Sequence, residues 1–243
     1  MTSAPAADQR RLLDVQDLDT RLAQLAHKRR SLPALARIAE LDAQIADLDT
    51  ALVTSRTAAS DLRTEVAKAE TDVEQVRSRA ARNQARLDGG QVGAKDAQAL
   101  TSELASLAAR QSHLEDVELE VKERLEAHEA AVAELEKAYA ALQADRAAVV
   151  AERDAGFAEI DAEADRVRAE RERAAEGLDQ GLVALYERLR GQHGTGAAAL
   201  RGNRCEGCRL ELTSVDLEAI RSRPADAVVR CEECSRILVR LTD

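Results

Sequence analysis

Four cysteines, arranged as two identical pairs, are the residues of this sequence best suited to chemistry. Cys205 and Cys208 form one C-x-x-C pair, and Cys231 and Cys234 form the other, with 22 residues between the pairs. Each pair lets two thiolates point at one ion from a single tight turn, and two pairs supply the four sulfur ligands that a structural zinc site prefers. The sequence therefore predicts one structural Zn²⁺ ion, held tetrahedrally by all four cysteines.

Redox chemistry and catalytic zinc are the alternative roles for these cysteines, and both fit less well. A thioredoxin-like pair lies in a βαβ setting that is not found in this sequence, and a second pair would be redundant. A catalytic zinc site keeps one coordination position open, whereas four cysteines complete the shell. The sequence also contains no P-loop, no dinucleotide-binding fingerprint and no Ser-His-Asp arrangement. We therefore expect a protein without enzymatic activity.

The residues between and after the cysteine pairs fit a small zinc ribbon. Residues 209–212 alternate as a strand, residues 213–216 resemble a capping box that opens a short helix, and residues 237–239 read as a final strand. Gly207 is expected to ease the first metal-binding turn. A module of this size has too little core to fold alone, so zinc binding would supply much of its folding free energy.

Two long series of apolar residues in alternating steps of three and four must position this module. One runs from Ile38 to Leu87 and the other from Leu100 to Val149. A seven-residue repeat of this length requires a left-handed coiled coil with a partner helix. Residues 88–96 separate the two series and include three glycines within five residues, which predicts a reversal of the chain. Nearly equal arms favour an antiparallel hairpin within one chain, and dimerisation of hairpins remains open.

These patterns predict a mainly α protein with two domains. Residues 1–190 would form the coiled-coil hairpin, with its tip near residues 88–96, and residues 191–243 would form the C4 zinc ribbon with short strands and a short helix. Pro33 predicts a kink or break near residues 31–34, because proline disfavours helical geometry in the residue before it. Gly177 and Gly181 predict an interruption or bend late in the return helix.

Composition and charge limit the classes of function. Aromatic residues make up 1% of the chain and charged residues 33%, which is typical of long exposed helices rather than a large globular core. The net charge is −10, and the acidic excess lies in the helical part, so its length should repel nucleic acid. No window is apolar enough for a membrane span and no signal pattern opens the sequence. We expect a cytoplasmic bacterial protein, in which the cysteines stay reduced.

Two groups of basic residues are candidate contacts for a partner or for phosphate. Arg77, Arg79, Arg82, Arg86 and Lys95 lie near the predicted tip, and Arg209 and Arg236 lie beside the cysteines. Arginine is well suited to phosphate. The arginines at the tip also fit a solvated helix face, and those of the ribbon could instead offset the thiolate charge.

Several of these segments together resemble a known bacterial family with an N-terminal coiled-coil hairpin and a C-terminal C4-type zinc ribbon. They are the two cysteine pairs, residues 185–189, residues 236–238 and the tip sequence 92–100. Two residues depart from the family pattern. Ser235 stands where a glycine commonly follows the fourth cysteine, and Ala97 replaces a common aromatic residue.

The resemblance implies an interaction protein without catalysis. Members of the family are described as binding an alternative sigma factor or secretion components, and one lineage as binding messenger RNA. We expect a zinc-binding adaptor, scaffold or chaperone-like protein that binds a protein partner, in transcription or its regulation, as a monomer or weak homo-oligomer. The alternative is a regulator that binds RNA or DNA through the arginine-rich ribbon. The two differ in salt response, because phosphate binding weakens steeply with salt.

Overall fold

A computed structural model describes residues 3–241 and is mainly helical. Its elements in order are α1 (Ala6–Arg30), α2 (Pro33–Asp88), α3 (Ala94–Ala175), α4 (Gln180–His193), β1 (Ala197–Arg201), β2 (Arg204–Cys205), α5 (Ser214–Arg221) and β3 (Ile237–Arg240). Contacts divide the chain into two compact units, one of which spans residues 36–150. We call that part the hairpin unit and the remaining described residues the ribbon unit. The predicted fold class is confirmed.

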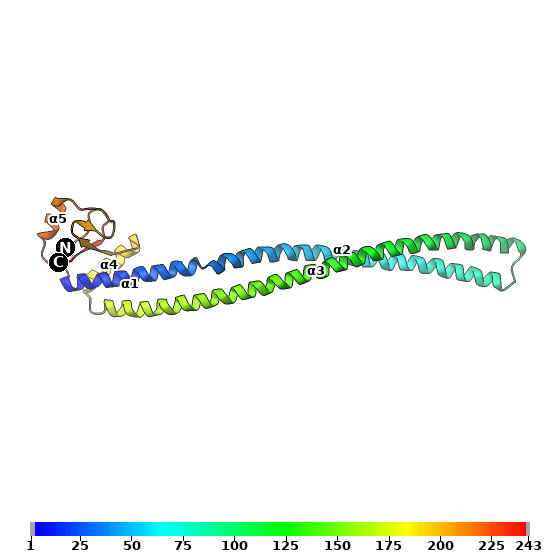
Figure 1. Cartoon of the computed structure of the whole chain (residues 1–243), viewed down its shortest axis with the longest axis horizontal. Helices are drawn as coiled ribbons and strands as arrows, with labels where there is room; N and C mark the ends of the chain where they lie inside the picture. The colour runs from blue at the N-terminus through cyan, green and yellow to red at the C-terminus, as the bar shows by residue number, and fades with distance from the viewer. Residues whose placement is uncertain (1–2, 242–243) are drawn as a thin grey trace. The chain divides into compact units, whose positions relative to one another are not determined.

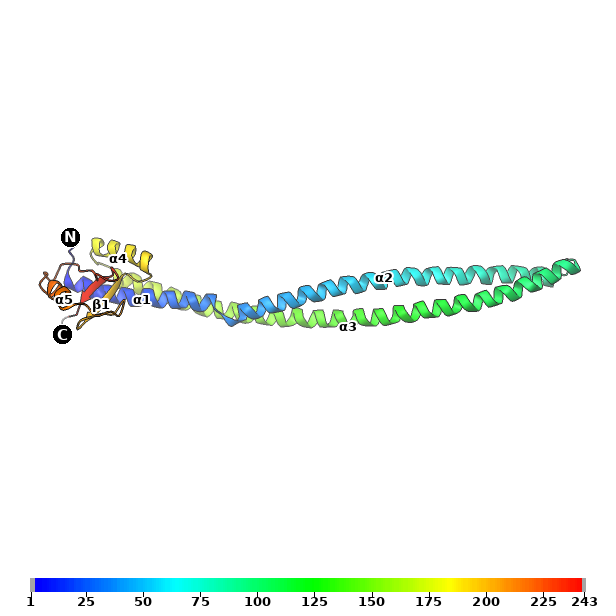
Figure 2. The ribbon, with the colours of Figure 1, turned by 90° about the horizontal axis from the view of Figure 1, so that it is seen from above.

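In the hairpin unit, α2 and α3 run side by side, as Figures 1 and 2 both show. The seam contains buried residues that follow the predicted heptads, among them Leu41, Leu52, Leu62, Val66, Val73 and Val76 of α2 and Leu100, Leu107 and Val121 of α3. The chain reverses between Asp88 and Ala94, where Gly90 adopts a positive φ of 65° that a residue with a Cβ rarely takes. The predicted antiparallel hairpin is therefore formed within one chain.

Ion pairs between α2 and α3 flank the seam. Arg56 contacts Glu136 at 2.7 Å, and Arg63 contacts Glu129 at 2.6 Å. Both pairs are exposed, so each contributes only about 0–1 kcal/mol. Their regular spacing favours one register of the two helices over a shifted one.

Proline and glycine end the helices largely where the sequence indicates. Helix α1 ends at Arg30 and α2 begins at Pro33, which as the first residue of a helix loses no internal hydrogen bond, so the predicted break is confirmed. Gly177, with φ of 72°, lies between α3 and α4. The predicted interruption is therefore found at residues 176–179, and Gly181 is the second residue of α4. Helix α4 also continues to His193, beyond residue 190, and ends at Gly194 in the left-handed conformation.

The ribbon unit contains a three-stranded sheet in the order β2-β1-β3, with β1 antiparallel to β2 and parallel to β3. One face of the sheet packs on α1 and α4 through Ala197, Ile237 and Val239. The other face covers a second core with Leu200 and Leu238, together with two of the cysteines. Successive side chains of a strand point to opposite faces of the sheet. The sheet therefore packs against the helices on one face and against the metal-binding core on the other.

Two details of the ribbon differ from the expectation. Residues 209–212 do not form a strand, and only Glu211 makes a bridge there, to Arg204. Strand β1 was not predicted, because its alanine-rich sequence is extended by pairing with β3, about 40 residues later in the chain. The domain boundary at residue 190 stays a prediction. The two compact units have other boundaries, because α1 and α4 share a core with β1 and β3.

Candidate metal centre

The four cysteines converge on one point of the ribbon unit. Their sulfur atoms all lie within 4.8 Å of one another, and none of the four takes part in a disulfide. The Sγ atoms of Cys205 and Cys234 are 3.9 Å apart, as are those of Cys208 and Cys231. A tetrahedral zinc ion with Zn–S bonds of about 2.3 Å separates its sulfurs by about 3.8 Å. The donor set therefore fits zinc.

The two pairs sit on turns with the same hydrogen-bond pattern. In the first turn, the amide of Arg209 donates to the carbonyl of Cys205, and the amide of Cys205 donates to the carbonyl of Leu210. In the second turn, Ser235 and Cys231 make the equivalent bonds. Arg209 and Ser235 have positive φ values of 63° and 62°. Each turn therefore places the residue after its second cysteine in the left-handed conformation, which is costly for a residue with a Cβ.

Gly207 acts through packing rather than through its backbone conformation. It is not among the glycines with positive φ, so a left-handed backbone is not the reason for a glycine here. A Cβ built at Gly207 would lie 2.9 Å from both Ala198 Cβ and Arg236 Cδ. The first turn therefore approaches β1 too closely for any side chain at this position.

Burial changes the acidity of the cysteine thiols. Burial raises the pKa of Cys231 to about 12 and also raises the pKa of Cys205. Burial acts in the same direction on Cys234, but hydrogen bonds from Arg236 and from the neighbouring thiols lower its pKa to about 7. Because zinc binds thiolates, the buried sulfurs need the charge of the ion to stay deprotonated.

Several ribbon arginines hold the backbone of the site in place. The Nε atoms of Arg204 and Arg230 donate to the carbonyls of Arg209 and Ser235, one brace for each metal-binding turn. Arg236 donates to Thr195 Oγ1 and to the carbonyl of His193. Of the two ribbon residues predicted as contacts, Arg209 is exposed, whereas Arg236 is engaged within the ribbon unit.

Arg240 has the same bracing role on a larger scale. Its guanidinium donates to five backbone carbonyls between Ile220 and Ala227. This single side chain therefore holds the loop after α5 against β3.

The residues predicted as contacts at the tip divide into two classes. Arg77 and Arg79 pair across the seam with Glu115 and Glu103, both at 2.5 Å. The other three, Arg82, Arg86 and Lys95, are exposed and form no ion pair with any residue between 3 and 241. The three unpaired cations remain candidates for contact with a partner.

A buried polar network that sequence reasoning missed joins α1, α3 and α4. The Asp19 carboxylate accepts a hydrogen bond from Tyr186 Oη at 2.7 Å and two from Arg171, at 2.7 and 3.2 Å. Glu187 then pairs with both Arg171 and Arg190. The Asp19 side chain is 3% exposed, so its charge is balanced inside the core rather than by solvent.

The network shifts the pKa values of its members. Burial and the hydrogen bond to Asp19 raise the pKa of Tyr186 above its usual range. The hydrogen bond to Asp19 raises the pKa of Arg171. Tyr186 therefore stays protonated and Arg171 stays charged, which keeps both as donors to Asp19.

Two glutamines of α1 attach the ribbon to the helices. Gln16 Oε1 accepts hydrogen bonds from the amides of Gly196 and Ala197 at the start of β1. Gln9 Nε2 donates to the carbonyls of Ala4 and Asp226. Gln9, Leu12, Gln16 and Asp19 follow the same steps of three and four as the coiled-coil seam. This second periodic stripe was the signal that could have revealed them.

Two family models match the chain. The model of the CT398-like coiled coil hairpin domain matches residues 15–194, and that of the C4-type zinc ribbon domain matches residues 204–238. The chain belongs to the CT398-like coiled-coil hairpin family. Neither model describes a catalytic family. With the sulfur geometry above, the match to the zinc ribbon confirms the prediction of one structural zinc ion bound by four cysteines.

Relatives of this CT398-like protein match over nearly their whole length. Uncharacterized proteins of Mycobacterium tuberculosis strains CDC 1551 and H37Rv are each 38% identical over 238 residues, which cover 98% of this chain and 97% of theirs. A solved structure from Mycobacterium smegmatis is 34% identical, with a TM-score of 0.89, and the match covers 98% of this chain and all of that one.

The fold extends to more distant bacteria. The structure of CT398 from Chlamydia trachomatis has a TM-score of 0.72 at 20% identity, over 97% of this chain and 98% of that one. This likeness shows the fold alone. Among the described residues of the CT398-like chain, the helices contain no stretch with the length and apolarity that a membrane crossing requires.

Proposed function

We propose that this protein is a non-catalytic, zinc-dependent adaptor of the cytoplasm, and that it holds a protein partner. The observation that carries the proposal is the complete set of four sulfur ligands in a chain that also has an exposed two-helix arm. A closed shell of four cysteine sulfurs leaves no coordination position for a substrate, so the ion would serve the fold. The helices then offer long surfaces to another macromolecule. Cysteines that serve as metal ligands rather than in disulfides fit the reducing environment of the cytoplasm.

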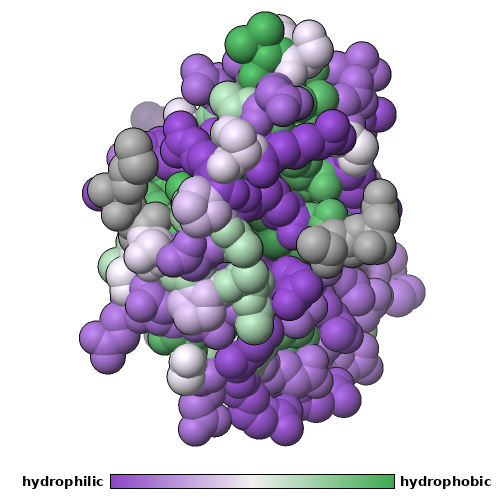
Figure 3. All heavy atoms as spheres, turned by 90° about the vertical axis from the view of Figure 1, so that its left-hand side faces the viewer, coloured by the Kyte–Doolittle hydropathy of each residue, from purple (hydrophilic) through white to green (hydrophobic). Residues whose placement is uncertain are grey.

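The ribbon arginines support a protein partner over a nucleic acid. Four of the eight arginines around the cysteines donate to groups of the ribbon unit itself, namely Arg204, Arg230, Arg236 and Arg240. Their guanidinium groups are therefore partly occupied, which reduces the number of N–H donors free to contact phosphates. The face that Figure 3 draws is mostly hydrophilic, with smaller hydrophobic areas between the polar side chains.

Affinity capture from native lysate tests the proposal. Intact protein and the Cys205→Ser variant would each be used with and without nuclease. The adaptor requires protein partners that survive nuclease treatment with the intact protein. Co-purifying RNA or DNA, lost on nuclease treatment and on raising the salt concentration, would contradict the proposal and favour the nucleic-acid alternative.

A further inference from the structure

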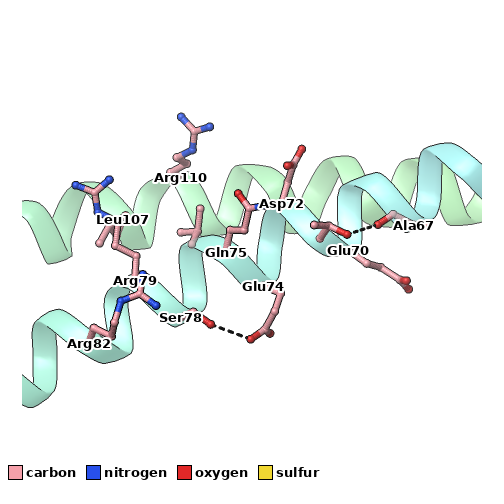
Figure 4. A pocket seen from close by; sticks show the side chains of 12 residues that line it. Ala67, Glu70, Asp72, Glu74, Gln75, Ser78, Arg79, Arg82, Leu107 and Arg110 are labelled. Atoms are coloured by element: carbon pink, nitrogen blue, oxygen red, sulfur yellow. Dashed lines mark hydrogen bonds between the residues drawn. The ribbon is translucent and has the colours of Figure 1, made fainter.

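Three arginines of α2 form a stripe near the end of the hairpin unit. Arg79, Arg82 and Arg86 follow one another at steps of three and four residues, so they lie on one face of the helix. Arg79, which pairs with Glu103, and Arg82 line a hollow of about 930 Å³ together with Arg110 of α3. Figure 4 shows these three arginines at one end of the hollow. Arg86 lines a second hollow of about 460 Å³ beside the turn between the helices.

The positive charge of this surface is local. Residues 77–110 include six basic and three acidic residues, whereas the rest of the hairpin unit includes eight basic and nineteen acidic residues. Arg82, Arg86 and Arg110 are exposed and make no ion pair in the described part of the chain. Three acidic residues, Glu70, Asp72 and Glu74, line the rest of the larger hollow, so its positive charge is confined to the end with the arginines (Figure 4). The attraction for an anionic group therefore ends within a few helical turns.

The larger hollow also has an apolar floor. Val76 of α2 and Leu107 of α3 line it, and each is 8% exposed. A ligand that presents only charge would gain nothing from these side chains. A ligand with both an acidic and an apolar stripe would contact the arginines and the floor at the same time.

We propose that this arginine groove, formed by Arg79, Arg82 and Arg110 over Val76 and Leu107, binds an acidic amphipathic helix of a protein partner. The inference rests on the proposed adaptor function and assigns a surface to it. A partner helix laid along α2 repeats its side chains at the same steps of three and four, so its acidic residues meet the arginine stripe. Farther along the hairpin unit the acidic surface repels such a helix, which fixes where it binds.

A nucleic acid fits this groove less well than a protein helix. Its phosphates continue beyond the length of the stripe, where they would meet the acidic residues of the hairpin unit. The three aromatic residues of the chain, Tyr139, Phe157 and Tyr186, do not line the groove, so no ring is available there to stack on a base.

Site-specific cross-linking tests the assignment. Benzoylphenylalanine would replace Gln75, an exposed residue that lines the groove, in the full-length protein. After irradiation in native lysate, mass spectrometry would identify the cross-linked segment. The same label would be placed in a variant with Arg82→Glu and Arg86→Glu. The matched control is Lys68→Glu, because Lys68 is exposed, lies two heptads before Arg82 on the same face of α2 and does not line the groove.

We expect a cross-linked protein segment with acidic residues at helical spacing. Its yield should fall at least about tenfold with the two reversals, because each of them replaces an attraction by a repulsion, and by less than about twofold with Lys68→Glu. A cross-link to nucleic acid, to a basic segment or to a second copy would overturn the assignment, as would equal yields in both variants. If capture finds nuclease-resistant partners that do not cross-link at residue 75, the groove is wrong and the adaptor stands. If capture finds no protein partner, both are wrong.

Discussion

Removal of the hydrogen bond between Tyr186 and Asp19 should destabilise the ribbon unit with almost no change in side-chain shape. Tyr186 is fully buried, and its hydroxyl lies 2.7 Å from the carboxylate of Asp19. A hydrogen bond to a charged group contributes about 1.5–3 kcal/mol. In Tyr186→Phe the carboxylate keeps both bonds from Arg171, so the loss should be near the lower end, about 1.5 kcal/mol in the free energy of unfolding.

Chemical denaturation followed by circular dichroism would measure this loss, with hydrogen exchange of residues 180–201 as a local readout. Tyr139→Phe is the matched control. Tyr139 is only partly exposed on α3, and its hydroxyl accepts a bond from Gln143 in an exposed pair, so this variant should change stability by less than about 0.5 kcal/mol. Equal effects of the two variants would refute the reasoning that the buried network orders the ribbon unit.

The dependence on pH gives a second check of the same contact. The pKa of Tyr186 is raised by burial and by the hydrogen bond to Asp19, whereas an unfolded tyrosine titrates near pH 10. Above pH 10 the unfolded state therefore binds fewer protons than the native state, and the free energy of unfolding falls as the pH rises. The advantage of the wild type over Tyr186→Phe should be complete below pH 10 and should shrink above it. An advantage that stays constant to pH 11 would contradict this assignment.

Three other changes have expected outcomes. Ser235→Gly should strengthen the ribbon by about 1 kcal/mol, because glycine adopts the positive φ of this position without a steric cost, and chelator competition for zinc would measure it; Ser222→Gly, at an ordinary helical φ, should not strengthen it. Gly196→Ala should destabilise the ribbon unit by more than about 1 kcal/mol in thermal denaturation, because the added Cβ would lie 2.5 Å from the carbonyl oxygen of Tyr186. The control is Gly191→Ala, whose added Cβ meets no atom within 4 Å, so this variant should be neutral or stabilising. Cys205→Ser should abolish zinc binding and speed hydrogen exchange in α1 and α4, because these helices share a core with the sheet. Exchange in residues 36–150 should stay unchanged, and faster exchange in both units would contradict the division of the chain.

The helices and the metal site could be predicted from the sequence because their signals are local. The heptad repeat, the glycines at the turn and Pro33 each act through neighbouring residues, so these local signals indicated where α2 begins and ends and where α3 begins. The C-x-x-C pairs carry their geometry in four residues, and the two pairs together specify a tetrahedral shell. The left-handed conformation of Ser235 also explains why a glycine commonly stands there in the family pattern.

The tertiary structure decided the features that depend on residues far apart in the chain. Asp19 and Gln16 look like exposed polar positions of α1, and only the approach of α3, α4 and β1 turns them into buried partners of Arg171, Tyr186 and the β1 amides. Strand β1 exists because β3 pairs with it, not because its own alanines favour a strand. Gly207 is required because β1 packs against its turn. The sequence by itself determined the helices, their turn and the zinc ligands. Long-range packing decided how the ribbon is attached to α1 and α4, since spacing can place Gln16 and Asp19 on one face of α1 but cannot name their partners in α3, α4 and β1.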